Sequence, residues 1–195
     1  MAFFLTAKSS SLASAQRIEI VKNVSLAILF AIITAISSKI EIPLPPVPFT
    51  LQTLAVILSG VILGSRLGFL SQIMYLGMGL AGLPVFAHTA DFSIGLGVLA
   101  SPTGGYLLAF PIAAFIAGSI AGKEKSTISL TLSFIAGEAI ILTAGMLYLN
   151  TFFFHDLTKS FQFGVAPFMI WTAAKIILGV GASKSWTAVK SKIKE

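Results

Sequence analysis

The chain contains no cysteine and very little charge. Without a thiol it cannot form a disulfide, use a thiolate nucleophile or bind zinc through sulfur. Its two histidines, His88 and His155, lie far apart and do not have the i, i+4 spacing of a helical metal site, so no metal is expected. Only 10% of the residues are charged, against roughly 25% in a soluble domain. Water is therefore not the expected solvent for most of the surface.

The residues that are present are mostly apolar, at 56% of the chain with a mean hydropathy of +0.95. In lipid every backbone N–H and C=O must be paired within the chain, which permits only helices or closed barrels. The apolar runs here are much longer than the roughly ten-residue strands of a barrel. The sequence therefore predicts an all-α membrane protein, a six-helix transmembrane bundle. The expected spans are Val24–Ile40, Leu51–Leu63, Leu67–Val85, Tyr106–Gly122, Ser129–Asn150 and Phe163–Ala182.

The positive charges favour six spans over five. The segment Leu51–Val85 is open to a second interpretation as one long helix, because its first part is short for a span. With six spans and a cytoplasmic N-terminus, ten of the 13 Lys and Arg residues are cytoplasmic, two are external and Lys175 is intramembrane. With five spans, four are inside, seven are outside and Arg66 is buried in lipid. The positive-inside rule favours the first arrangement, with both termini cytoplasmic and Gly64-Ser65-Arg66 as a cytoplasmic turn.

This topology divides the chain into three parts. Residues 1–23 form a cytoplasmic segment, 24–182 form the six-helix transmembrane domain and 183–195 form a basic cytoplasmic tail. Because no cleavable signal peptide is convincing, the first span is expected to act as the targeting signal. The net charge of +6 is carried by loops and termini, where it orients membrane helices, so no nucleic-acid partner is expected.

Two unusual loops fall on the external side. The first, Glu41–Phe49, contains four prolines, which end both flanking helices. The second, Leu83–Gly105, is long for a connection and too apolar for a disordered linker. We expect this loop to fold over, or dip into, the outer mouth of the bundle.

Two segments resemble nucleotide-binding loops but lack the context that the chemistry requires. Gly77–Gly82 matches G-x-G-x-x-G, yet it lies near the end of an apolar helix that Pro84 closes. Close helix packing explains these small residues better. Ala117–Glu124 departs from the phosphate-loop pattern at its first glycine and at its Ser/Thr position. With no nucleophile–base pair, metal cluster or nucleotide loop in the sequence, an enzyme is not expected.

Two ionisable residues fall inside predicted spans, where an unmatched charge costs several kcal/mol. Glu138 lies near the middle of the fifth span and Lys175 lies in the sixth. Either the two pair with each other, or Lys175 faces an external cavity and receives a carboxylate ligand. Trp171, one turn before Lys175, is either an interfacial anchor or a wall of that cavity.

Alanines recur at every fourth position of the first span, at Ala27, Ala31 and Ala35. Such a small-xxx-small face lets another helix approach closely. The face either packs inside this protein or docks a partner subunit, and the spacing alone does not decide between the two.

Three longer segments, Pro46–Thr53, Leu80–Ala87 and Ser101–Phe110, carry a resemblance to a known family. In sequence, order and spacing they resemble the BioY family, the biotin-binding S components of energy-coupling factor (ECF) transporters, over about residues 24–182. The resemblance implies a six-helix bundle that binds biotin near its external face, without a cofactor, in the bacterial cytoplasmic membrane. For some members it also implies an ATPase pair and a transmembrane coupling subunit, and it favours docking of the alanine face to that subunit. Whether this chain uses such partners, acts alone or self-associates stays open.

The chemistry of biotin matches residues near the predicted mouth. The ureido ring requires donors and acceptors, the thioether ring requires apolar walls and the carboxylate requires a cation. For these three roles we expect, in turn, Gln52, Thr103, His88 and Asp91; Phe49, Phe86, Tyr106 and Trp171; and Lys175.

The sixth span departs from the family pattern. Pro167-Phe168 and Lys175 are kept, but Trp171 and Thr172 stand where Gly and Asp are usual, and His88 replaces a small or amide residue. Glu138 is therefore expected to substitute partly for the missing acid as the partner of Lys175, with Thr172 near them. The alternative functions are uptake of another carboxylated vitamin and a membrane assembly subunit that does not transport.

Overall fold

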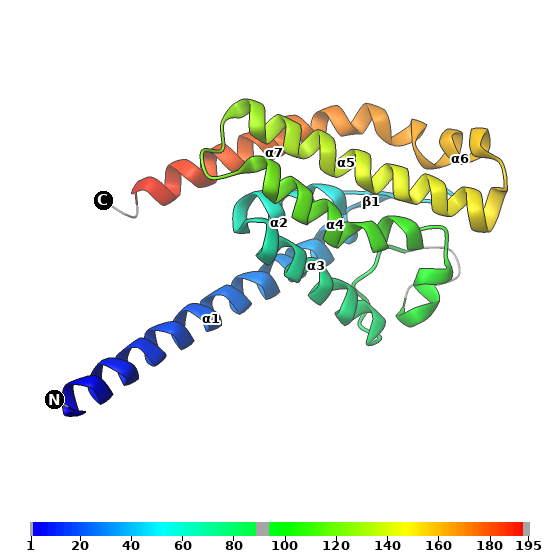
Figure 1. The fold of residues 1–195 in the computed structure, drawn as a ribbon. Coiled ribbons are helices and arrows are strands. Elements are labelled where there is room, and N and C mark those ends of the chain that lie inside the picture. Colours follow the sequence, from blue (N-terminus) through cyan, green and yellow to red (C-terminus); the bar gives the residue numbers. More distant parts are fainter. Residues whose placement is uncertain (1, 89–93, 193–195) are drawn as a thin grey trace.

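A computed structural model describes residues 2–88 and 94–192 of the 195 in the chain. The described residues are mainly helical (Figure 1). The helices are α1 (Ala2–Ser38), α2 (Gln52–Leu63), α3 (Ser65–Leu80), α4 (Gly104–Ala121), α5 (Thr127–Leu149), α6 (Leu157–Gly164) and α7 (Ala166–Lys192). The smaller elements are the strands β1 (Glu41–Ile42) and β2 (Phe49–Thr50), a 3₁₀ helix at Gly95–Ala100 and a π-helical turn at Asn150–Phe154. The predicted all-α fold class is confirmed.

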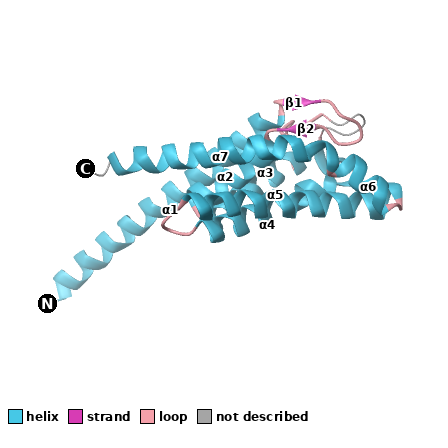
Figure 2. Cartoon of the chain, turned by 90° about the horizontal axis from the view of Figure 1, so that it is seen from above, coloured by secondary structure: helices cyan, strands magenta, loops and turns pink. Residues whose placement is uncertain are grey.

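The helices form three groups, of which the α4–α5 pair lies between the other two. The first group is α1, α2 and α3, which contact one another, and α4 packs on α2 and α3. The second group is the α4–α5 pair, and the third is α6 with α7, which lie against α5. The two described chain ends lie on the same side of the molecule, and the first half of α1 projects beyond the bundle (Figures 1 and 2).

Four helices in the described part of the chain are long and apolar enough to cross a membrane alone. They are Gln16–Ser38, Gly104–Ala121, Thr127–Phe154 and Ala166–Val189. The helices α2 and α3 have 12 and 16 residues, which is short of the roughly 20 needed for a square crossing. A polytopic helical membrane protein is therefore supported, while the count of six spans and the orientation of the termini remain predictions.

Several helix boundaries differ from the predicted ones. The third helix ends at Leu80 rather than at Val85, and the last helix continues to Lys192 rather than ending at Ala182, so most of the predicted tail is helical. The first helix begins at Ala2 rather than at Val24, so part of the predicted N-terminal segment continues the helix. The predicted last span, Phe163–Ala182, is divided by Val165 into the end of α6 and the start of α7. Pro167 explains the division, because proline lacks an N–H and is tolerated in the first turn of a helix but not within one.

A sharp turn at Gly64 separates α2 from α3. The residue has φ +90°, a conformation that side-chain-bearing residues rarely adopt. The interpretation of Leu51–Val85 as one long helix is therefore wrong, and the predicted turn is present. The helices α2 and α3 approach closely because glycines meet where they cross. A Cβ on Gly68 would lie 2.5 Å from Gly60 Cα, and one on Gly118 of α4 would lie 2.6 Å from Gly60 O.

The alanine face of α1 packs inside the protein. Ala27 and Ala31 are both 0% exposed, and Ala35 packs against the same core. The apolar side chains on the other faces of α1, including Ile28, Ile32 and Ile36, are exposed. The expectation that Ala27, Ala31 and Ala35 dock a partner subunit is therefore corrected, because α3 and α2 of the same chain occupy that side of α1.

The proline-rich loop forms a short hairpin rather than an irregular connection. Glu41 pairs with Thr50 and Ile42 pairs with Phe49 in an antiparallel ladder. The four prolines lie between the strands or beside them, where the missing N–H groups are not needed for the ladder. The hairpin places Phe49 and Thr50 directly before α2, at the edge of the cavity described below.

Candidate ligand-binding site

A cavity lies at the point where the hairpin, the segment after α3 and four helices meet. It holds about 540 Å³ of empty space, including the part open to solvent. Its lining residues are Val47, Pro48, Thr50, Gln52, Thr53, Phe86, Ala87, Thr103, Tyr106, Leu107, Phe110, Glu138, Leu142, Phe168 and Lys175. They come from both predicted external loops and from α2, α4, α5 and α7.

One end of the cavity holds a buried cation and a buried acid. Lys175 of α7 and Glu138 of α5 are 3% and 2% exposed, and Nζ lies 3.5 Å from Oε1. Thr53 of α2 connects them, since its hydroxyl accepts a hydrogen bond from Lys175 Nζ at 2.6 Å and donates one to Glu138 Oε1 at 2.6 Å. The Phe49 ring lies 4.6 Å from the Lys175 nitrogen and adds a cation–π contact.

This group still has hydrogen-bonding capacity. A lysine ammonium has three N–H donors, and among the residues that the structure describes its two polar partners are Thr53 and Glu138. Among the described residues, Glu138 Oε2 has no hydrogen-bond partner although it is buried. An unused donor and an unused acceptor at one end of a cavity suit a polar group of a ligand.

A second set of polar side chains lines the cavity near the start of α2 and α4. Thr50 donates to Gln52 Oε1 at 3.3 Å, and Gln52 Nε2 donates to the hydroxyl of Tyr75. Thr103 shares a hydrogen bond of 2.8 Å with Ser101. These contacts fix the amide and the hydroxyls in place, and they leave the second Gln52 N–H for a ligand.

Aromatic rings form much of the remaining wall. Phe86 and Tyr106 are buried, and the Tyr106 hydroxyl donates to Gly164 O at 2.7 Å, which holds its ring across the junction of α6 and α7. Phe168 lies 6.3 Å from Tyr106 and 6.2 Å from Phe49, between ring centroids. The cavity is thus mostly apolar with a few placed polar groups, which is the usual composition of a small-ligand site.

The structure brings most of the sequence-predicted site residues to this cavity. Those that line it are Gln52, Phe86, Thr103, Tyr106, Glu138 and Lys175. Phe49 lies beside them, against Lys175 and Phe168.

Three other predicted residues that the structure describes are not found in the lining. His88 has a side chain that is 69% exposed and is held by Glu41. Trp171 is 46% exposed, and its ring is tilted by 41° against that of Phe49, with ring centroids 5.4 Å apart. Thr172 donates to Phe168 O of its own helix at 3.0 Å. Asp91 lies outside the described residues.

Sequence reasoning missed Thr53 and Phe168. Thr53 follows Gln52 in the first turn of α2, and it is the contact that joins α2 to α5 and α7. Its position inside the Pro46–Thr53 segment was a signal that could have identified it. Phe168 belongs to the retained Pro167-Phe168 pair and lies one to two turns before Lys175 on α7.

The fold is that of a polytopic helical membrane protein, and the cavity is its candidate small-ligand site. The chain belongs to the BioY family, whose sequence profile matches residues 7–191.

Individual relatives agree with this assignment. A probable biotin transporter BioY of Pyrococcus horikoshii is 43% identical over 149 residues, which is 76% of this chain and 86% of that protein. The biotin transporter BioY of Thermotoga maritima is 40% identical over 150 residues, covering 77% of this chain and 86% of that protein. A crystal structure of the S-component for biotin from an ECF-type ABC transporter has the same fold, with a TM-score of 0.77 and 24% identity over 87% of this chain and 93% of that one.

Proposed function

We propose that the chain binds biotin in the cavity and takes part in its uptake across the membrane. The observation that carries this is the buried Lys175 ammonium at one end of a mostly apolar cavity, with Gln52 and Thr103 lining it elsewhere. Biotin has a carboxylate, an apolar thioether ring and a polar ureido ring, which need these three kinds of surroundings. The names of the relatives support the same ligand.

In this arrangement Lys175 uses its remaining N–H for the carboxylate, while Thr53 and Glu138 hold the ammonium in place. The walls are Phe86, Tyr106 and Phe168. Gln52 and Thr103 serve the ureido ring. The work of these residues is binding and orientation, in keeping with a transporter family rather than with an enzyme.

Binding of radiolabelled biotin to the purified protein tests the proposal. We expect saturable binding that unlabelled biotin displaces and that other carboxylated vitamins displace much less. Stronger displacement by another carboxylated vitamin would show that this vitamin, and not biotin, is the preferred ligand. Absence of binding to folded protein would refute a substrate-binding role and favour the assembly-subunit alternative.

We further propose that the cavity opens to the outside and that both termini are cytoplasmic, in the bacterial cytoplasmic membrane. The distribution of Lys and Arg supports this orientation. Residues 1–23 and 183–195 then flank the binding domain 24–182 on the cytoplasmic side. Because the chain has no cysteine, Lys123→Cys in the α4–α5 loop and Leu96→Cys near the mouth allow a direct test. A membrane-impermeant thiol reagent applied to intact cells should label Leu96→Cys only, and the reverse pattern would refute the topology.

We also propose that the protein works either with an ECF coupling subunit and ATPase pair or alone, including as a self-associated form. The description of the solved S-component supports the first arrangement. Since the alanine face is internal, a partner would meet the exposed apolar side of α1, which includes Ile28, Ile32 and Ile36. Copurification from native membrane separates the two cases: an ATPase in the complex supports the first, and the chain by itself supports the second.

A further inference from the structure

One wall of the cavity is a segment without regular secondary structure. Residues 85–88 follow the end of α3, and Phe86 and Ala87 of this segment line the cavity. The backbone hydrogen bond that holds the segment itself is a local one, from Val85 N to Leu83 O at 2.8 Å. The position of this wall therefore depends on contacts from other elements.

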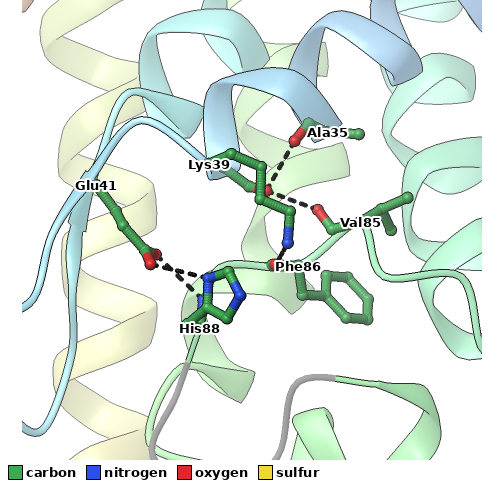
Figure 3. Close-up of polar contacts among 7 residues, drawn as sticks. Ala35, Lys39, Glu41, Val85, Phe86 and His88 are labelled. Atoms are coloured by element: carbon green, nitrogen blue, oxygen red, sulfur yellow. Dashed lines mark hydrogen bonds and ion pairs between the residues drawn. The ribbon is translucent and has the colours of Figure 1, made fainter.

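Side chains at the end of α1 supply part of these contacts (Figure 3). Ser38 donates to Val85 O at 2.8 Å, and Lys39 Nζ donates to Phe86 O at 2.6 Å. Val85 O also accepts a hydrogen bond from the Tyr75 hydroxyl at 3.2 Å. Consecutive carbonyls of the wall are thus held by α1, and one of them also by α3.

Glu41 holds the far end of the same segment with both carboxylate oxygens. Its Oε2 accepts from the backbone N–H of His88 at 3.1 Å, and its Oε1 lies 3.0 Å from His88 Nδ1 (Figure 3). The Glu41 side chain is only 17% exposed, whereas that of His88 is 69% exposed. Because Glu41 pairs with Thr50 in the hairpin and Thr50 lines the cavity, this carboxylate joins two walls of the site.

The ring of Phe86 is closely packed against α3. It is 1% exposed and meets Tyr75 edge-on at 5.5 Å between ring centroids. Gly79 of α3 makes room for it, since a Cβ there would collide with the ring. A displacement of the 85–88 backbone would therefore withdraw Phe86 from a fitted position at the cavity.

We propose that Lys39 and Glu41 are positioning residues for the binding site, which hold residues 85–88 against the β1–β2 hairpin by hydrogen bonds. In this proposal His88 binds Glu41 and does not contact the ligand. The proposal rests on the function above, in which the cavity takes biotin. When these hydrogen bonds are lost, residues 85–88 can move, so bound ligand dissociates faster although the rest of the cavity is unchanged.

A double-mutant cycle on dissociation of labelled biotin from the purified protein tests this. Glu41→Ala should raise the dissociation rate about three- to tenfold, the loss expected for a pair of charge-assisted hydrogen bonds near the surface. His88→Ala should have a smaller effect, because its backbone N–H still reaches Glu41. The double variant should match Glu41→Ala. If His88→Ala has its full effect in the Glu41→Ala background, His88 acts independently of Glu41 and the proposal is wrong.

Lys39 gives a second test by conservative rescue. Lys39→Met should raise the dissociation rate, and Lys39→Arg should restore it, because arginine also donates to a carbonyl. Glu19→Ala, an exposed acid on α1 away from the mouth, is the matched control and should leave the rate unchanged. Equal rates for Lys39→Met and Lys39→Arg would overturn the role of Lys39.

A measurement without ligand separates this proposal from the proposed function. In the cysteine-free chain, Ala87→Cys reports on the wall, and its rate of reaction with a thiol reagent should rise several-fold when Glu41→Ala is added. An unchanged rate would refute the positioning role even if biotin binds. A raised rate in a protein that does not bind biotin would support the positioning role and refute the proposal that biotin is the ligand.

Discussion

Lys175 on α7 donates a hydrogen bond of 2.6 Å to Thr53 on α2, although 122 residues separate them in sequence. The Thr53 hydroxyl in turn donates a hydrogen bond to Glu138 Oε1 on α5. A single hydroxyl thus joins three helices at the polar end of the cavity. The two interpretations of Lys175 are therefore compatible, because it pairs with Glu138 and also lines the cavity.

Thr53→Val removes this connection while nearly preserving the shape of the side chain. We expect the free energy of unfolding in detergent to fall by about 1–3 kcal/mol, since a buried donor and acceptor lose their partner. Thr53→Ser keeps the hydroxyl and is the control. Equal stability of the two variants would show that Lys175 and Glu138 satisfy each other without Thr53.

Lys175→Met removes the charge and keeps much of the apolar stem. A charge-assisted hydrogen bond contributes roughly 1.5–3 kcal/mol, or about one to two powers of ten in affinity. Biotin binding should weaken by that amount, and binding of biotinamide, which lacks the carboxylate, should weaken much less.

The double variant Lys175→Met/Glu138→Gln separates the loss of the cation from the stranding of a buried acid. It should recover stability, because an unpaired buried carboxylate is removed. It should not recover biotin affinity, measured by equilibrium binding. Full recovery of both would assign Lys175 to neutralising Glu138 alone.

Ala31→Leu should destabilise the isolated protein. The residue is fully buried in the core, and overpacking a core typically costs about 1–3 kcal/mol. Ile32→Leu, on an exposed position of the same helix, is the control and should change the thermal midpoint little. If Ala31→Leu keeps its stability in isolation but loses a copurifying partner, the alanine face docks that partner after all.

Gly60→Ala should be destabilising although alanine favours helices over glycine by roughly 1 kcal/mol. The added Cβ would lie against the carbonyl oxygen of Ala114, a backbone atom of α4 that cannot move alone. Gly77→Ala is the matched control, since nothing among the described residues outside its own stretch of helix lies within 4 Å of its Cβ position. Its thermal midpoint should stay the same or rise. A comparable loss at Gly77 would show that the loss at Gly60 does not come from contact with the Ala114 carbonyl.

The pattern of apolar residues in the sequence predicted the presence of the helices better than the residues at which they begin and end. Apolar runs are sufficient to identify helices in a chain this poor in charge, and Gly64 supplied a backbone conformation at which α2 stops. The break between α6 and α7 was missed because the residues on both sides of it are apolar, although Pro167 marks the start of the final helix.

The candidate site divides in the same way. Gln52 and Tyr106 were identified because they lie in segments that resemble the family and match the chemistry of biotin, and Lys175 because a charge inside a span is unusual. Thr53 was missed because a threonine in a helix usually bonds its own backbone, and only the approach of α5 and α7 gives it other partners. His88 was placed in the site by its position in the loop, whereas Glu41 draws it away from the cavity.

The sequence by itself determined that the protein is helical and membrane-embedded, where its chain turns at Gly64, and that a lysine is buried among apolar residues. Only the tertiary structure decided which side of each helix faces protein. Ala31 is buried and Ile32 is exposed, yet both are apolar. The physical reason is that lipid tails are as apolar as a protein core, so hydropathy does not distinguish them. The partners of the buried polar groups, Lys175 with Thr53 and Glu41 with His88, follow from that packing.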